Sequence, residues 1–313
     1  MIAYVFPGQG AQTVGMGKDL YDRFPEARAV IDAVESRSGL PLKRLMWEGP
    51  ADDLTATQHA QVALFACGVA AFKVLEAQGA PPPTMVAGHS LGEYTALVAA
   101  GALDLGPATD LVTLRGQSMA KAPPGTMAAV LGMDPDQLTR LCADIPGQVV
   151  VANYNTLDQL VVSGEVKAVE ALHDAARRAG AKRVVMLNVG GAFHSPLMAP
   201  ALGPLSAALR EAPWKDATIP VVHNVDATPN QRADRFADRL TRQLESSVRW
   251  VDCVGAMRDA GIRMFVELGA GRTLAGLIRK IDRSLQAVVV EDGISLDKTL
   301  SDLHALAKEP LVR

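Results

Sequence analysis

The amino-acid sequence predicts an α/β protein with a parallel sheet, interrupted by a smaller unit of order β-α-β-β-α-β. Three features indicate this class. A strand-like run ends in a glycine-rich loop near the amino terminus, and a second strand and loop continue into a helix at 85–101. Short strands and two helices then fill the segment between Pro123-Pro124-Gly125 and Gly190-Gly191, and strands and helices alternate again from Pro196. We therefore expect a large discontinuous domain, residues 1–124 and 191–313, and a small inserted domain, residues 125–190.

Apolar spacing and turn residues predict the elements of the first part of the chain. The loop Pro7-Gly8-Gln9-Gly10 ends the first strand, and its residues permit unusual backbone angles. The expected elements are strand Ile2–Phe6, helices 25–37 and 59–77, strand Met85–Ala87, a helix ending near Gly101 and a helix at 107–120.

The middle of the chain shows the order found in ferredoxin-like folds, within about 65 residues. Its expected elements are strand Met127–Leu131, helix 135–143, strands Val149–Asn153 and Leu160–Ser163, helix Val166–Ala179 and strand Arg183–Val189. In the last part we expect helices at 196–211, 232–244, 253–260, 272–282 and 296–307, with strands Ile219–Val222, Met264–Glu267 and Ala287–Val290.

The composition is that of a folded protein with ample material for a core: 313 residues, 49% hydrophobic and 21% charged. Lys and Arg number 31 against 34 Asp and Glu, and the net charge of −3 argues against non-specific binding to nucleic acid or an acidic membrane. The longest apolar run, Val62–Phe72, is shorter than the roughly 20 residues that span a bilayer, and no signal peptide is evident. Cys67, Cys142 and Cys253 lack disulfide or metal spacing, so we expect buried, reduced thiols in a cytoplasmic protein.

Gly88-x-Ser90-x-Gly92 is the pattern of a nucleophile elbow. The glycines allow a tight turn from strand to helix, which presents the serine hydroxyl above the sheet at a helix N-terminus. A strand precedes this motif and a helix follows it, as that mechanism requires. The alternative is a glycine-lined packing turn without chemistry.

Arg115 lies on the apolar stripe of its predicted helix, four residues from both Leu111 and Met119. A guanidinium on an apolar face keeps its proton and needs an anion or several carbonyl contacts. The structural alternative is an internal ion pair. The functional one is a bidentate clamp for a substrate carboxylate.

His194 follows the last strand of the small unit, just before Pro196, where the chain returns to the large unit. A serine nucleophile requires a base, and histidine is the usual one. His194 is our candidate, although five other histidines compete and a structural role at a domain junction is the alternative. No motif marks a carboxylate as third member of a triad.

Other patterns of binding or catalysis are absent from the sequence. No phosphate-binding GxxxxGK[ST] occurs, Gly8-x-Gly10 lacks the third glycine of GxGxxG at Thr13, and no cluster has zinc spacing. The run Arg177–Arg183 is the one dense basic patch, and a solvated helix end is its simplest explanation.

Together these residues resemble the malonyl-CoA:acyl-carrier-protein transacylase family of fatty acid biosynthesis. The matching segments run in family order along almost the whole chain: FPGQGAQ (6–12), GHSLGEYTAL (88–97), LRGQSM (114–119), GAFHSPLM (191–198), Gln243 with SVRW (247–250), and ELGAGRTLAGLI (267–278). The resemblance implies an α/β-hydrolase-like core with an inserted ferredoxin-like subdomain.

The resemblance also implies roles for individual residues. Ser90 would attack the malonyl thioester, with His194 as base and later as acid. Gln243 matches the position whose main-chain carbonyl orients this histidine in the family, so a third carboxylate is not expected. The amides of Gln9 and Leu91 would form the oxyanion hole.

On the same basis, the substrates would be malonyl-CoA and the phosphopantetheine thiol of an acidic acyl carrier protein, with no metal or redox cofactor. Arg115 would bind the malonyl carboxylate, and Phe193 would crowd an α-methyl group and so favour malonyl over methylmalonyl. The basic run 177–183 becomes a possible contact for the carrier protein. The family is commonly monomeric.

The sequence departs from the family at two places. The linker 121–126 is shorter than usual, and Gly-Ala-Gly at 269–271 replaces Gly-Pro-Gly. The sequence leaves three other functions open. These are the transacylase subunit of a malonate decarboxylase, a serine thioesterase or esterase, and a non-catalytic carrier-binding scaffold.

Overall fold

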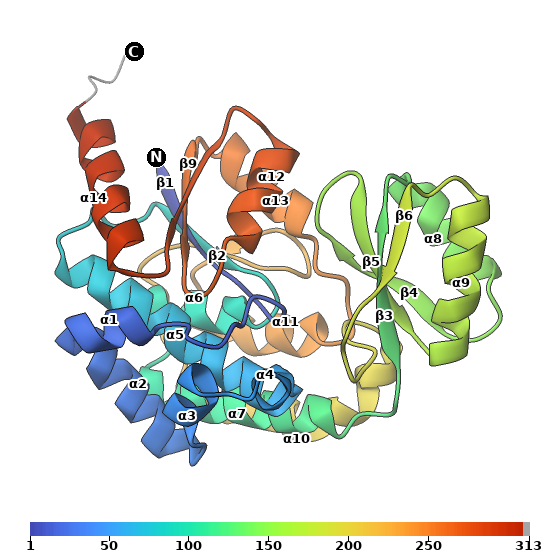
Figure 1. Ribbon diagram of the computed structural model, residues 1–313, viewed down its shortest axis with the longest axis horizontal. Coiled ribbons are helices and arrows are strands. Elements are labelled where there is room, and N and C mark those ends of the chain that lie inside the picture. The colour runs from blue at the N-terminus through green and yellow to red at the C-terminus, as the bar shows by residue number, and fades with distance from the viewer. Residues whose placement is uncertain (309–313) are drawn as a thin grey trace.

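The computed structural model describes residues 1–308 and contains two sheets, each with its own helices (Figure 1). The larger lobe holds both the beginning and the end of the described chain, and the smaller lobe is formed by its middle. The α/β class with a parallel sheet and a ferredoxin-like insertion is confirmed. The domain boundaries predicted from the sequence stay a prediction.

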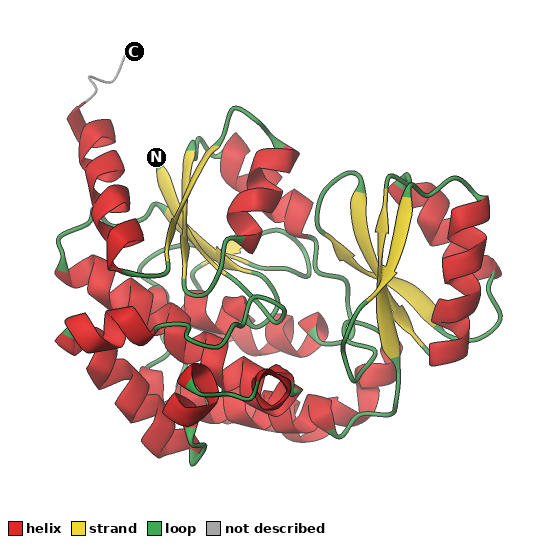
Figure 2. Ribbon diagram, viewed as in Figure 1, coloured by secondary structure: helices red, strands yellow, loops and turns green. Residues whose placement is uncertain are grey.

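Strands and helices alternate along most of the chain (Figure 2). The strands are β1 (Ile2–Phe6), β2 (Met85–Gly88), β3 (Thr126–Leu131), β4 (Val149–Tyr154), β5 (Gln159–Gly164), β6 (Arg183–Met186), β7 (Val221–Val222), β8 (Pro229–Asn230), β9 (Met264–Leu268) and β10 (Gln286–Val290). The helices are α1 (Lys18–Arg23), α2 (Pro25–Ser38), α3 (Leu42–Trp47), α4 (Ala51–Thr55), α5 (Thr57–Ala77), α6 (Gly92–Ala99), α7 (Leu105–Ala120), α8 (Pro135–Asp144), α9 (Val166–Arg178), α10 (Ala199–Glu211), α11 (Phe236–Gln243), α12 (Trp250–Asp259), α13 (Thr273–Ile281) and α14 (Gly293–Lys308), with 3₁₀ turns η1 (Pro196–Met198) and η2 (Ala233–Arg235).

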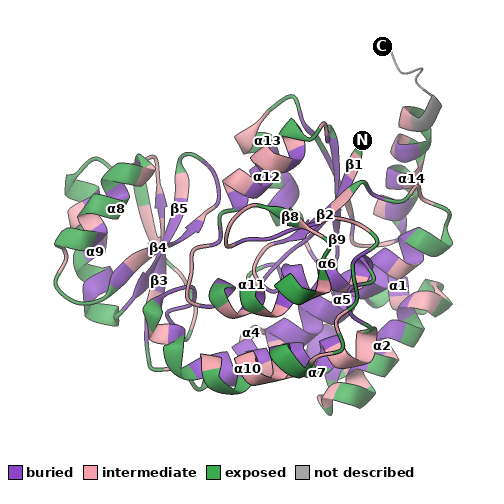
Figure 3. Ribbon diagram, turned by 180° about the vertical axis from the view of Figure 1, so that it is seen from behind, coloured by how far each residue is buried: buried purple, intermediate pink, exposed green. Residues whose placement is uncertain are grey.

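The large sheet has the order β10-β9-β1-β2-β7-β8, parallel except for β8 against β7. Helices cover both faces, because alternate residues of β1 point to opposite sides. Ala3 and Val5 pack in the cluster that includes α12 and α13, whereas Tyr4 and Phe6 pack in the cluster that includes α5. Figure 3 shows the buried strands of the sheet at the centre of this lobe.

Helix α5 is long and apolar enough to cross a membrane by length and composition alone. However, 83% of its most apolar window is buried inside the protein, where it packs against α2, α6 and α7. The core therefore accounts for its hydrophobicity.

The small sheet has the order β4-β5-β3-β6, and all its pairs are antiparallel. Successive residues of each strand again point to opposite faces of the sheet. Ala128, Val130 and Val162 pack beneath α8 and α9, whereas Met127 and Val161 belong to the large core cluster on the opposite face. One face of the small sheet is thus turned toward the large lobe.

The structure differs from the sequence expectations mainly in short elements and element ends. Helix α7 begins at Leu105 rather than 107, since proline is tolerated in the first turn of a helix. Strand β6 ends at Met186 rather than 189, because the chain leaves the sheet edge and turns back toward the large lobe. The elements α1, α3, α4 and β8 were not expected, and each has six residues or fewer.

Candidate active site

The site lies at the carboxyl edge of the large sheet. Three neighbouring parallel strands, β1, β2 and β7, end there, and the loop that follows each of them contributes residues. These loops are Pro7–Gly10, His89–Leu91 and His223–Asn224. Parallel strands place such loops side by side, which is where open α/β sheets bind ligands.

The turn from β2 to α6 presents Ser90. A Cβ on Gly88 would clash with the backbone of Gly92, and one on Gly92 would clash with the carbonyl of Phe6, so the turn needs both glycines. Ser90 has a φ of 53°, in the left-handed region that non-glycine residues rarely adopt. Its amide donates to Asn224 Oδ1 at 2.7 Å, which fixes the strained backbone.

His194 is positioned to take the proton of Ser90. Its Nε2 lies 2.7 Å from Ser90 Oγ. On the other side of the ring, Nδ1 lies 2.8 Å from the carbonyl oxygen of Gln243 and 3.2 Å from that of Ser246. Carbonyl oxygens only accept hydrogen bonds, so Nδ1 carries the hydrogen and Nε2 is left as acceptor for the serine hydroxyl. Burial, together with nearby Arg115, lowers the pKa of His194 to about 3, so the ring is neutral.

Both lobes help to orient this histidine. The loop that carries Ser246 is bound to β4 of the small sheet: Ser247 Oγ donates to the carbonyl of Val151 at 2.6 Å, and the amide of Val248 donates to that of Ala152 at 2.8 Å. The position of the Ser246 carbonyl therefore depends on the position of β4 in the small lobe, and the orientation of His194 depends on that carbonyl.

Arg115 lies in the same site, fully buried on α7. Its Nη2 donates to Ser90 Oγ at 3.0 Å and to Gln243 Oε1 at 3.2 Å, and its Nη1 donates to Gln61 Oε1. These three acceptors are neutral oxygens, and a guanidinium has five N–H groups. Burial lowers the pKa of Arg115, yet an arginine keeps its proton in proteins. A cation thus stands beside the serine with N–H groups left for an anion.

Two backbone amides near Ser90 are candidates for binding an oxyanion: that of Gln9, and that of Leu91, the residue after the serine. Within residues 1–308, neither has a protein hydrogen-bond acceptor, although most buried backbone amides do. Gln9 lines the cleft, and Leu91 begins the turn into α6, whose N-terminus favours negative charge. The geometry therefore suits an oxyanion hole.

A cleft of about 250 Å³ opens above Ser90 between the two lobes. Gln9, Ser90 and His194 line it from the large lobe. The small lobe contributes Met127, Ala129, Asn153, Asn155, Gln159 and Val161, from the sheet face turned away from α8 and α9 and from the loop between β4 and β5.

Comparison with known proteins agrees with this geometry. Residues 3–297 match the family model described as the acyl transferase domain. The chain is 39% identical over 308 residues to the malonyl CoA-acyl carrier protein transacylase of Bacillus subtilis, covering 96% of this chain and 97% of the relative. The chain belongs to the malonyl CoA-acyl carrier protein transacylase family.

Solved structures of the transacylase family share the whole fold. The enzyme from Coxiella burnetii is 36% identical, with a TM-score of 0.94, and the match covers 96% of this chain and 97% of that one. A malonyl-transacylase solved in complex with a type II PKS acyl-carrier protein is 38% identical, with a TM-score of 0.93 and coverage of 96% and 99%.

The other histidines of this transacylase family member have different partners. His89, next to the nucleophile, directs Nε2 to Asn155 Oδ1 at 2.9 Å, and removal of the ring from solvent lowers its pKa. His223 bonds to Glu93 at 2.6 Å, and His59 to the carbonyl of Asp53. Among the histidines of the described residues, His194 is the one whose ring contacts Ser90 Oγ.

Two further polar groups complete the site and were missed from the sequence. Gln61 accepts from Arg115, and its Nε2 donates to Gln9 Oε1 at 3.3 Å. Beneath the serine, Gln243 Nε2 donates to Glu93 Oε2 at 2.8 Å and to the carbonyl of Ser90 at 3.0 Å. The sequence signal for Gln61 was a glutamine immediately before the apolar run 62–72. The signal for Glu93 was a carboxylate within the otherwise apolar first turns of α6.

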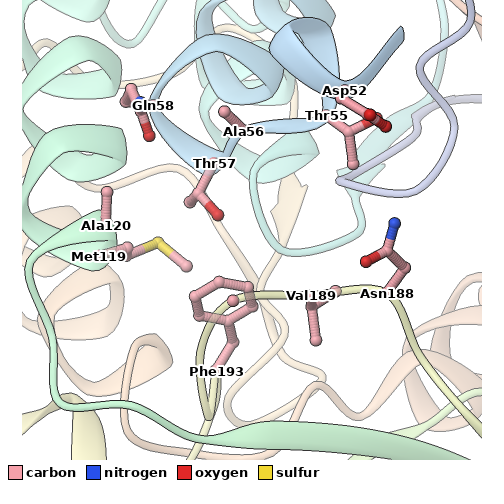
Figure 4. A pocket seen from close by; sticks show the side chains of 11 residues that line it. Asp52, Thr55, Ala56, Thr57, Gln58, Met119, Ala120, Asn188, Val189 and Phe193 are labelled. Atoms are coloured by element: carbon pink, nitrogen blue, oxygen red, sulfur yellow. The ribbon is translucent and has the colours of Figure 1, made fainter.

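Phe193 lies between the cleft and a second pocket of about 370 Å³. Figure 4 shows its ring across that pocket from Thr57, with Met119 beside it. Phe193 thus lines both spaces, and its role in selecting the acyl group stays a prediction. Within residues 1–308, no three His, Cys, Asp or Glu side chains converge as a metal-binding group.

Proposed function

We propose that this enzyme moves a malonyl group from malonyl-CoA to the phosphopantetheine thiol of an acyl carrier protein, through a malonyl ester of Ser90. The observation that carries the proposal is that Ser90 Oγ bonds both to His194 Nε2, at 2.7 Å, and to Arg115 Nη2, at 3.0 Å. A base and a carboxylate-binding cation at one nucleophile suit a thioester that also bears a free carboxylate.

In the first half-reaction, Ser90 Oγ forms a bond to the thioester carbon while its proton passes to His194 Nε2. The carbonyl oxygen becomes an oxyanion, which the amides of Gln9 and Leu91 stabilise. The carbon–sulfur bond then breaks, and His194 returns the proton to the sulfur of coenzyme A. The Gln243 carbonyl holds the Nδ1 hydrogen throughout, and it stabilises the imidazolium as it forms.

The second half-reaction reverses these steps with another thiol. His194 takes the proton of the pantetheine thiol, whose sulfur forms a bond to the ester carbon. The bond between that carbon and Ser90 Oγ breaks, and Oγ regains its proton from His194. Arg115 binds the malonyl carboxylate in both halves, so an acyl group without one leaves N–H groups of the buried guanidinium without acceptors.

The carrier, pathway and compartment belong to the same proposal. The relatives are named for an acyl carrier protein, and one solved relative holds such a carrier, which supports this acceptor and a role in fatty acid biosynthesis. We place the enzyme in the cytoplasm as a monomer. Its cysteines, Cys67, Cys142 and Cys253, are free and buried, which suits a reducing compartment.

Intact-protein mass spectrometry after brief incubation with malonyl-CoA tests the proposal. A malonyl adduct should appear with malonyl-CoA, be much weaker with acetyl-CoA, and be absent from Ser90→Ala. Equal labelling by acetyl-CoA would remove Arg115 as the selector. Release of coenzyme A without an adduct would indicate a thioesterase, and neither adduct nor release would indicate a non-catalytic scaffold. Transfer only to the carrier of a malonate decarboxylase would identify the subunit of that enzyme.

A further inference from the structure

Arg115 is a buried cation without a directly bonded carboxylate. Within residues 1–306, the buried Asp, Glu, Lys and Arg side chains are Glu93, Arg115 and Glu267. A charge removed from water needs an opposite charge nearby, or its burial is strongly unfavourable. Glu267 accepts the amides of Leu274 and Ala275 at the N-terminus of α13, and burial raises its pKa to about 7, so this carboxyl is satisfied locally. Glu93 is the remaining buried anion.

Gln243 joins Glu93 to Arg115. Its Oε1 accepts from Arg115 Nη2 at 3.2 Å, and its Nε2 donates to Glu93 Oε2 at 2.8 Å. The carboxylate therefore acts on the guanidinium through one intervening amide. Burial lowers the pKa of Arg115, and the nearby Tyr94 and then the charge of Glu93 oppose that effect.

His223 does not cancel the charge of Glu93. Its Nδ1 lies 2.6 Å from Glu93 Oε1, which assigns the hydrogen to Nδ1. Its buried Nε2 has no partner among the described residues, so a second hydrogen there would be an unsatisfied donor. The geometry fits a neutral ring. The amide of Asn224 is a further neutral donor to Glu93, at 3.0 Å.

We propose that Glu93 is the permanent counter-charge of Arg115, held one side chain away by Gln243 so that the guanidinium stays available to the carboxylate of the acyl substrate. A carboxylate bonded directly to Arg115 would balance its charge equally well but would compete with that substrate. Glu93 is then a residue that sets specificity without touching the acyl group. The substrate part rests on the proposed function; the pairing of the two charges does not.

A thermal double-mutant cycle tests the pairing, because it needs no activity. Glu93→Gln should lower Tm by roughly 5–10 °C, since it leaves a buried cation uncompensated. Adding Arg115→Gln should restore part of that loss. Additive losses in the double variant would overturn the proposal. If Glu93→Gln does not fold, folding of the double variant supports the pairing, and failure of the double variant to fold contradicts it.

The matched control is Glu267→Gln, which removes the other buried carboxylate. Its loss of Tm should be the same with Arg115 and with Arg115→Gln, because Glu267 contacts a helix terminus instead. Equal coupling of both carboxylates to Arg115 would contradict a specific partnership with Glu93.

Binding of free malonate, measured by calorimetry, tests the substrate part. In Glu93→Gln the malonate carboxylate becomes the sole anion near Arg115, so Kd should fall several-fold relative to the wild type. A merely structural role of Glu93 predicts weaker binding, which would overturn this part. If malonate binds neither protein, the carboxylate role of Arg115 fails, and the thermal cycle alone decides the pairing.

Discussion

Arg115 Nη2 and Ser90 Oγ are 3.0 Å apart, so the cation assigned to the substrate carboxylate touches the nucleophile itself. This closeness limits the acyl group that can use both residues. In malonyl, a single methylene separates the carboxylate from the thioester carbon, so the two ends can meet Arg115 and Ser90 together. The same contact helps to polarise the serine oxygen before substrate arrives.

Replacing Arg115 by alanine should change selectivity more than the capacity for acylation. We expect kcat/KM for malonyl-CoA to fall by about 100-fold or more, since two charge-assisted hydrogen bonds are lost, while acylation by acetyl-CoA falls far less. Stopped-flow release of coenzyme A measures both. Arg37→Ala, an exposed arginine on α2, is the control. Equal losses for both acyl groups would contradict the carboxylate role.

The strained backbone at the nucleophile makes a prediction about stability. Ser90 has a φ of 53°, which glycine adopts freely and alanine does not. Ser90→Gly should therefore be more stable than Ser90→Ala by about 1 kcal/mol, although both are inactive. Urea denaturation compares the two variants. An alanine variant as stable as the glycine variant would argue against strain at this turn.

The acylation rate should not fall at about pH 6.5, where an ordinary histidine base becomes protonated. Burial and Arg115 lower the pKa of His194 to about 3, below the usual value of about 6.5, so the unprotonated base persists as pH falls. We expect kcat/KM for malonyl-CoA to stay nearly constant from about pH 8 to about pH 5. Loss of rate centred near the ordinary histidine value would contradict this.

The same shift acts on stability with a defined sign. Between the folded pKa of about 3 and the ordinary value of about 6.5, His194 binds a proton only in the unfolded chain. The free energy of unfolding therefore falls as pH drops through that window. Urea denaturation followed by circular dichroism at each pH measures this change in the free energy of unfolding. The measurement is independent of the acylation rate.

The sequence predicted the residues expected to react or bind substrate better than the residues that hold them in position. Ser90 stands in a local motif, and Arg115 is exceptional on its own helix face. His194 was one of six competing histidines until the family resemblance singled it out. Glu93 and Asn224 meet across 131 positions of sequence, and Gln61 meets Arg115 across 54. Such contacts depend on tertiary packing, which no local pattern encodes.

The fold shows the same contrast between local sequence patterns, which could be predicted, and tertiary packing, which could not. Long, periodic helices such as α5 and α9 were predicted within two residues, because their apolar spacing extends over several turns. Short elements such as α3 and α4 have about one turn each, and packing rather than propensity decides whether they form. Strand β7 keeps only its last two predicted residues, Val221 and Val222, between β2 and the two-residue edge strand β8.

Enlarging the space around Phe193 should relax selectivity at the α-carbon. Phe193 is 6% exposed and lies where the cleft meets the second pocket, so its ring limits the room for an α-methyl group. Phe193→Ala should lower the preference for malonyl-CoA over methylmalonyl-CoA by about tenfold, the usual scale for one methyl group in an apolar pocket. Acylation rates with the two thioesters give the ratio. A ratio equal to that of the wild type would exclude Phe193 as a selector.

The basic run 177–183 should contribute to carrier docking through its position beside a second basic group. The amide of Lys182 donates to the carbonyl of Leu131 at 2.9 Å, and Leu131 lines a surface pocket together with Arg279, Lys280 and Arg283. Gln159 belongs to both that pocket and the catalytic cleft. Basic side chains thus lie both near the end of α9 and around this pocket, where Asp158 is the one acidic residue among the described residues that line it, and this arrangement suits an acidic carrier whose thiol must reach Ser90.

Charge reversal should therefore raise KM for the carrier in a graded order. Arg177→Glu with Arg178→Glu should raise it several-fold, and Lys280→Glu with Arg283→Glu should raise it more, because the second pair lies nearer the cleft. Lys18→Glu with Lys73→Glu, on α1 and α5 of the large lobe, is the control (Figure 1). Added salt should reduce all differences, since exposed charges are screened. An unchanged KM in the first pair would remove the run 177–183 from the docking surface, and an unchanged KM in both pairs would place the carrier elsewhere.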